Sequence, residues 1–246
     1  MRTPTHDGFS DGHDSRLRGN RPVFGPELGE FPDADQRRQS AGEGDTNEMK
    51  TGTTTVGLKT DDGVVLATDM RASAGYMVAS KDVQKVEEIH PTGALTIAGS
   101  VSAAQSLIRS LKAEVSLYES RRGEDMSMQA LSTLTANFLR SGAFLIVQPI
   151  LGGVDDDGPH IYSIDPLGGT TEEEYTVTGS GSQYALGVLE QEYDEELSVE
   201  EAKTVAARAI ESAVERDLAS GNGINVAVVT DEGVEITRHK DFAEVL

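Results

Sequence analysis

The sequence contains no cysteine, and no apolar run in it approaches the ~20 residues that a membrane-spanning helix needs. The absence of cysteine excludes disulfides, thiolate metal sites and a cysteine nucleophile. The N-terminus also lacks the roughly 7–15-residue apolar stretch of a secretory signal peptide. We therefore expect a soluble, cytoplasmic protein without membrane association, and 246 residues allow one domain or one domain plus an appendage.

Positive charge is also scarce. The chain has 21 lysines and arginines against 42 acidic residues, and its formal net charge is −21. Binding to phosphate backbones needs clustered cations, so this composition argues against nucleic acid as a partner. Molar salt screens the self-repulsion of such a surface within about 3 Å. The charge therefore predicts a source that lives in concentrated salt.

A salt-dependent stability follows from this charge. We expect the melting temperature to rise as KCl is increased from dilute to molar concentration, because screening weakens the repulsion between acidic side chains. A thermal melt at several KCl concentrations measures this. A melting temperature that falls over that range would refute the halophilic interpretation.

The chain divides into two segments of different composition. Residues 1–52 contain half of the eight prolines and only isolated aliphatic residues, without a period of 2 or 3.6. Such a segment cannot bury enough apolar surface to offset its ordering entropy. We predict that residues 1–52 are disordered and that residues 53–246 form the folded domain.

The folded segment shows strand and helix patterns in a definite order. Two helices follow the first group of strands, and two more follow the second group, the last with a capping box at Ser198 and Glu201. This order differs from the strand–helix alternation of a parallel sheet and favours antiparallel sheets with helices outside them. The predicted strands are 53–60, 64–69, 77–80, 85–89, 94–99, 144–154, 160–165, 173–179, 224–230 and 233–238, and the predicted helices are 100–123, 127–141, 182–193 and 198–220.

Several common sites do not fit the sequence. A dinucleotide fingerprint at residues 176–188 needs a third glycine where Tyr184 stands. The five histidines are scattered, and no G-x-S-x-G nucleophile elbow is present. The acidic run at residues 155–157 fits a solvated loop better than a metal site. We expect neither a metal nor a cofactor.

The threonine run after Gly52 offers a different chemistry. A hydroxyl is a poor nucleophile without a base, and a chain-terminal threonine carries its own base, the α-amine, with a pKa of about 7.7–8.0. An internal Thr53 has an amide instead, so cleavage after Gly52 would create the base. We interpret the glycine as supplying an unusual backbone conformation for that cleavage. On this spacing alone, an ordinary edge strand rich in threonine remains an alternative.

A family resemblance decides between these interpretations. The segments TGTTTVG, LATDMRAS, DVQKVEEI, TIAGSVSAAQ, TGSGSQYALGV and RDLASGNGINVAV, in that order, resemble the β subunits of the archaeal 20S proteasome. The resemblance covers essentially all of Thr53–Leu246. It implies an α/β fold, the four-layer α/β/β/α sandwich of N-terminal-nucleophile hydrolases, with two antiparallel sheets between helix pairs.

The resemblance also implies an activity. The chain would be a threonine endopeptidase that hydrolyses unfolded proteins to short peptides, with residues 1–52 as a propeptide that the protein removes itself between Gly52 and Thr53. Thr53 would be the nucleophile and its freed amine the base. The matching positions for the other catalytic groups are Asp69, Lys85, Ser180, Asp217 and Ser220, and the backbone N–H of Gly99 matches the oxyanion donor.

The same resemblance predicts how substrate binds. A peptide would lie extended along residues 71–73 and 99–101 as an added strand. The pocket for the residue before the scissile bond would then be lined by small or apolar side chains, namely Ala72, Ser73, Val83, Ile97 and Val101. These residues predict cleavage after hydrophobic residues.

The implied partners are those of a compartmental protease. They are a homo-heptameric β ring stacked on a second β ring, α-subunit heptamers that cap the rings, and a regulatory unfolding ATPase. Two rival interpretations remain. One is a processed hydrolase of the same fold that acts on small amides, and the other is a structural, non-catalytic ring subunit. Such subunits usually lose the threonine, the lysine or the Gly–Thr junction, whereas Gly52, Thr53 and Lys85 are all present here.

Overall fold

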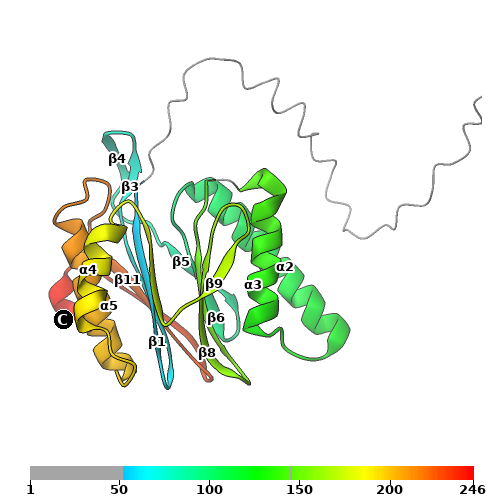
Figure 1. The fold of residues 1–246 in the computed structure, drawn as a ribbon. Coiled ribbons are helices and arrows are strands. Elements are labelled where there is room, and N and C mark those ends of the chain that lie inside the picture. Colours follow the sequence, from blue (N-terminus) through cyan, green and yellow to red (C-terminus); the bar gives the residue numbers. More distant parts are fainter. Residues whose placement is uncertain (1–51, 145) are drawn as a thin grey trace, which may run out of the picture. The chain divides into compact units, whose positions relative to one another are not determined.

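The structure is a computed structural model that describes residues 52–144 and 146–246 (Figure 1). The predicted disordered segment, apart from Gly52, lies outside the described residues. The described part contains two five-stranded antiparallel sheets, a short two-stranded sheet and helices that pack against the large sheets.

The first sheet brings distant parts of the sequence together at one end of its strands. Its strand order is β10-β1-β2-β11-β12. In this register Thr54 faces Gly179, and Ile224 faces Asp69. The start of β1 therefore lies beside the end of β10, while the end of β2 lies beside the start of β11. The strands are β1 (Thr54–Thr60), β2 (Gly63–Asp69), β10 (Tyr175–Gly179), β11 (Ile224–Thr230) and β12 (Gly233–His239).

The second sheet has the order β5-β6-β7-β8-β9, with each strand antiparallel to its neighbours. A separate hairpin of β3 (Ala72–Ala74) and β4 (Met77–Ser80) connects the two sheets along the chain. The strands of the second sheet are β5 (Val86–His90), β6 (Gly93–Thr96), β7 (Ile150–Asp155), β8 (Gly158–Ile164) and β9 (Thr170–Glu172).

Three apolar layers hold these elements together. Helices α4 (Ser182–Glu192) and α5 (Val199–Val214) cover the outer face of the first sheet, and α2 (Val101–Arg122) and α3 (Met128–Phe138) cover the second (Figure 1). A third cluster, which includes Leu66, Ile150 and Val229, lies between the two sheets. Burial of these layers is the main driving force for the fold. The predicted four-layer α/β/β/α sandwich is confirmed.

Helix starts follow the sequence closely. The side chains of Ser100, Ser127 and Ser198 each accept a hydrogen bond from a backbone N–H in the first turn of their helix. The capping box between Ser198 and Glu201 is present as predicted. These signals are local, so a sequence pattern is enough to find them.

Several predicted elements are wrong at their ends, and the three-residue strands β3 and β9 were not predicted. The helix predicted to reach residue 220 stops at Val214, because the next residues form a turn in which Asp217 accepts the N–H of Ala219. The strand predicted from residue 144 begins at Ile150, after a π-helix at Leu139–Ala143. The strand predicted to reach residue 99 ends at Thr96. A final 3₁₀ turn covers Phe242–Glu244.

Candidate active site

Thr53 lies immediately before β1, and only 4% of its surface is exposed. Its hydroxyl donates a hydrogen bond to the carbonyl oxygen of Gly52 at 2.6 Å and accepts one from Nζ of Lys85 at 3.0 Å. Its backbone N–H donates to Oγ of Ser180 at 3.2 Å. The Thr53 hydroxyl therefore contacts both the ammonium of Lys85 and the peptide carbonyl of Gly52.

The cation belongs to a buried ion pair. Nζ of Lys85 lies 2.7 Å from Oδ1 of Asp69, and both side chains are almost fully inaccessible. Asp69 also accepts three backbone N–H groups, from Thr54 at 3.1 Å, Arg71 at 2.9 Å and Gly221 at 2.8 Å. Burial of two charges is costly unless such bonds satisfy them. The carboxylate is therefore a fixed anchor for the lysine.

The pKa of Lys85 reflects this environment. Burial lowers the pKa of the ammonium below its ordinary value, while the charge of Asp69 and its hydrogen bond to Lys85 oppose that shift. The charge of Asp217 also opposes it, and the Arg71 guanidinium adds to it. A positive charge at 3.0 Å from the Thr53 hydroxyl stabilises the alkoxide form of that hydroxyl.

A second polar cluster lies on the other side of Thr53. Oδ2 of Asp217 accepts hydrogen bonds from the hydroxyls of Ser180 and Ser220, each at 2.6 Å. Oγ of Ser220 in turn lies 2.7 Å from Oγ1 of Thr54. These groups come from the end of β10, the turn after α5 and the start of β1. The cluster thus leads from the carboxylate to the main-chain nitrogen of Thr53 through Ser180.

Gly99 has a backbone that only glycine adopts easily, with φ of 109°. A Cβ at this position would lie 1.8 Å from the carbonyl oxygen of Ile146. Gly99 forms an isolated antiparallel bridge with Val147. The two hydrogen bonds of this bridge are made by the neighbours of Gly99 along the chain: the N–H of Ser100 donates to the carbonyl oxygen of Ile146, and the carbonyl oxygen of Ala98 accepts from the N–H of Gln148. The N–H of Gly99 is thus not used in the bridge, as an oxyanion donor requires.

The structure shows a steric reason for a glycine at position 52. The unusual backbone invoked from the sequence stays a prediction. A Cβ there would lie 1.8 Å from Cβ of Ala219 and 2.8 Å from Oγ of Ser180. A side chain at this position would therefore push the turn after α5 away.

The five predicted pocket residues occupy different environments. Ala72, Val83 and Val101 are half-buried. Ser73 is buried and donates to the carbonyl oxygen of Ala219 at 3.2 Å. Ile97 is 3% exposed and lies in the apolar cluster beneath α2. Their contact with a substrate stays a prediction.

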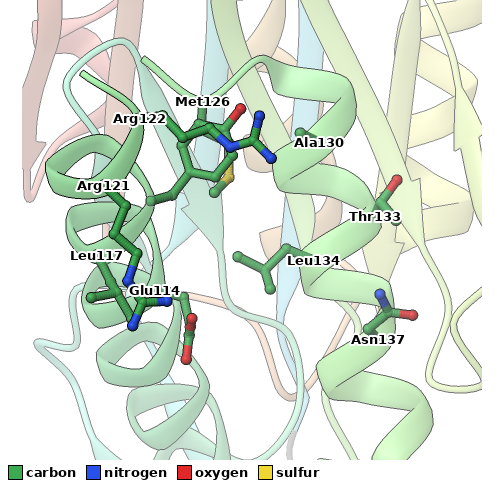
Figure 2. Close-up of a pocket in the computed structure, with 10 residues that line it drawn as sticks. Glu114, Leu117, Arg121, Arg122, Met126, Ala130, Thr133, Leu134 and Asn137 are labelled. Carbon is green, nitrogen blue, oxygen red and sulfur yellow. The ribbon is translucent and has the colours of Figure 1, made fainter. Parts of the chain in front are cut away.

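A surface hollow elsewhere contains none of the candidate residues. It lies between α2 and α3, where Leu134 of α3 points toward α2 (Figure 2). The hollow is lined by Glu114, Leu117, Tyr118, Arg121, Arg122, Met126, Ala130, Thr133, Leu134 and Asn137.

Within the described residues, no helix has the length and apolar character to cross a bilayer. No group of three or more potential ligands in this part of the chain is placed to hold a metal ion.

Sequence reasoning missed two side chains near the site. Arg71 donates from Nε to Asn222 at 2.9 Å and from a terminal nitrogen to the carbonyl oxygen of Leu218 at 2.7 Å, which ties the turn after α5 to the end of β2. Asn225 is fully buried beside Asp69. A polar residue inside the apolar run INVAVVT was a signal for Asn225, whereas Arg71 had no distinguishing pattern.

Comparison with known proteins decides the family. The model of the proteasome family, described as proteasome subunit, matches residues 49–229. The chain belongs to the proteasome family. This match includes the Gly52–Thr53 junction and both polar clusters around Thr53, so the geometry described above lies inside the family domain.

Curated relatives refine this assignment. The chain is 76% identical to "Proteasome subunit beta" of Halorubrum lacusprofundi and of Haloquadratum walsbyi, in each case over 100% of both chains. It is also 76% identical to the protein of that name in Haloferax volcanii over 98% of both chains. The predicted resemblance to proteasome β subunits of halophilic archaea is confirmed. Membership implies assembly into proteasome rings with α subunits.

Proposed function

We propose that the chain is the proteolytic β subunit of the 20S proteasome core, a threonine-type endopeptidase that activates itself by cleavage between Gly52 and Thr53. One observation carries the proposal. The hydroxyl of Thr53 lies between the Lys85 ammonium and the carbonyl of Gly52, with distances of 3.0 Å and 2.6 Å. Nucleophile, cation and scissile carbonyl are therefore in contact before any cleavage.

Self-cleavage would use these contacts in two steps. Oγ1 of Thr53 attacks the carbonyl carbon of Gly52 while Lys85 stabilises the negative charge that develops on the hydroxyl oxygen. Collapse of the intermediate breaks the peptide bond, and the hydroxyl proton passes to the Thr53 nitrogen, which leaves an ester. Water then hydrolyses that ester, which frees the Gly52 carboxylate and restores the hydroxyl beside a terminal amine.

Peptide hydrolysis would repeat the attack on an external substrate. The new amine of Thr53 accepts the hydroxyl proton and donates it to the leaving nitrogen of the substrate. Ser180, itself bonded to Asp217 at 2.6 Å, holds the amine in place. The N–H of Gly99 stabilises the oxyanion, and loss of such a donor costs about 10²–10³-fold in other enzymes.

Addition of a single methyl group at Gly52 tests the geometry of self-cleavage. We expect Gly52→Ala to slow release of the head by at least roughly tenfold, because the new Cβ would clash with Ala219 beside the scissile bond. Intact mass of the purified chain over time measures this.

Gly187→Ala is the matched control, because a Cβ at Gly187 meets no atom within 4 Å. This variant should release the head at the wild-type rate. Equal release from both variants would contradict the steric role of Gly52.

The proposed substrates are unfolded proteins cleaved after hydrophobic residues. Ala72, Val83 and Val101 carry no charge that would pair with a basic side chain, so reporter peptides that end in leucine or tyrosine should be hydrolysed faster than peptides that end in arginine. Rates on matched fluorogenic peptides measure the preference. Strong turnover of the arginine peptides together with weak turnover of the others would contradict it.

The proposed assembly is a homo-heptameric β ring stacked on a second one, capped by α-subunit heptamers and served in the cytoplasm by an unfolding ATPase. Retention of Gly52, Thr53 and Lys85 argues against a non-catalytic ring subunit. Degradation of unfolded casein by the assembled particle would separate the proposal from a hydrolase of small amides.

The decisive test is intact mass and N-terminal sequencing of the protein purified from its own cells. We expect a mature chain that begins TTTVGLK. Assembled particles that hydrolyse peptides while residues 1–52 remain attached to every copy would overturn the proposal.

A further inference from the structure

We propose that Asn225 is a positioning residue for the Asp69–Lys85 pair, and this inference rests on the proposed function. Its amide joins the strand end that carries Asp69 to the segment that carries Lys85. The catalytic distance between the two charged groups then depends on a side chain that touches neither the nucleophile nor the proposed substrate strand.

The position of Asn225 is unusual for a polar residue. It is the second residue of β11 and is 0% exposed. In a strand, alternate residues share a face, so Asn225 faces the same way as Ala227 and Val229, which lie in the apolar cluster between the two sheets. A buried amide costs free energy unless it is hydrogen-bonded. A role for its bonds explains why an apolar residue is not used here.

The donor atom of Asn225 reaches three acceptors. Nδ2 donates to Oγ1 of Thr68 at 2.9 Å, to the carbonyl oxygen of Val83 at 3.2 Å and to that of Asp69 at 3.4 Å. Thr68 and Asp69 end β2, whereas Val83 is two residues before Lys85. One amide thus bonds to the main chain on both sides of the ion pair.

The segment before Lys85 needs such support. Residues 82–85 form no regular secondary structure. Val83 N–H donates to the carbonyl oxygen of Met70 at 3.0 Å, and the carbonyl oxygen of Lys85 accepts from Ile97 at 2.7 Å. Among the described residues, two side-chain connections link β2 to this segment. One is the Asp69–Lys85 ion pair, and the other is the amide of Asn225, which bonds to both β2 and the segment. A displacement of about 1 Å in a catalytic group can cost as much as roughly 10²-fold in rate.

Arg238 on the neighbouring strand β12 fixes the orientation of the amide. Its Nε donates to Oδ1 of Asn225 at 3.2 Å, which directs Nδ2 toward the carbonyl groups. A terminal nitrogen of Arg238 also pairs with Asp82, three residues before Lys85. Arg238 therefore supports the segment before Lys85 from the outer side. Replacement of Arg238 tests the role of the Asn225 amide without a change in the apolar core.

The experiment compares four variants in particles assembled with the α subunits. Asn225→Leu replaces the amide by an apolar side chain with the same branching, and Arg238→Met removes the outer support of that amide. Thr135→Val removes a different buried hydroxyl, which is bonded to Leu131 within α3 at 2.8 Å. Thr53→Ala removes the proposed nucleophile. For each, kcat and KM on one peptide, the fraction of chains without residues 1–52 and the pH profile of kcat/KM are measured.

We expect Asn225→Leu to lower kcat by roughly 10- to 100-fold with KM within about twofold of wild type. Arg238→Met should show a smaller loss of the same kind, and Thr135→Val none. The alkaline limb of the pH profile should move to lower pH in Asn225→Leu, because a more distant Asp69 opposes less strongly the lowering of the Lys85 pKa by burial. A general loss of stability would not shift that limb.

Two outcomes would overturn the inference. One is a wild-type kcat and pH profile in Asn225→Leu, and the other, should that variant fail to assemble, is a wild-type kcat in Arg238→Met. Failure of the proposed function looks different, because wild-type particles would then hydrolyse no peptide or would retain their activity in Thr53→Ala.

Discussion

Replacement of Thr53 by alanine should leave every chain with its N-terminal head attached and reduce peptide hydrolysis by the assembled particle to background. The hydroxyl of Thr53 is the group in contact with both the Lys85 ammonium and the Gly52 carbonyl, so both reactions lose their nucleophile at once. Intact mass reports the first effect, and turnover of a fluorogenic peptide reports the second.

Two variants separate the loss of a nucleophile from the loss of a buried threonine. Thr60 lies at the other end of β1, is 2% exposed and donates to the carbonyl oxygen of Gly63 at 3.1 Å. Thr60→Ala should cost about 1 kcal/mol of stability and leave processing intact. Thr53→Ser, which keeps a hydroxyl, should still release the head. Complete processing of Thr53→Ala would refute the assignment.

Replacement of Lys85 by methionine should lower the rate of peptide hydrolysis by roughly 10²–10³-fold or more, because the alkoxide of Thr53 loses the nearest positive charge. Self-cleavage should slow as well. The variant also leaves Asp69 charged and buried without its partner, at a cost of about 3–5 kcal/mol. Peptide turnover and a chemical denaturation curve measure the two effects separately.

The double variant Asp69→Asn/Lys85→Met distinguishes chemistry from stability. Removal of both charges should recover part of the lost stability, since no unpaired buried charge remains, yet activity should stay low. Lys59→Met is the matched surface control, because Lys59 pairs with Glu174 at 2.9 Å in a partly exposed position. Recovery of activity together with stability in the double variant would show that Lys85 only holds the fold together.

The types and order of the longer elements could be predicted because their signals are local, whereas the three-residue strands β3 and β9 were missed. Alternation of apolar residues, the turn at residues 231–233 and the serine caps at positions 100, 127 and 198 each depend on a few neighbouring residues. The ends of elements were harder. Helix α5 stops at Val214, and Asp217 in the following turn accepts both the nearby N–H of Ala219 and the hydroxyl of Ser180, which lies 37 residues away along the chain.

The candidate site shows the same division. The candidate residues could be named from motifs alone, since Gly52, Thr53 and Lys85 stand in segments whose order resembles one family. The contacts that keep these residues in place became visible in the folded chain, namely the steric limit set by Ala219 at Gly52 and the amide of Asn225 between β2 and the segment before Lys85. Motifs reflect chemical identity along the chain, whereas clashes and hydrogen bonds depend on distances between strands that meet only after the two sheets have packed.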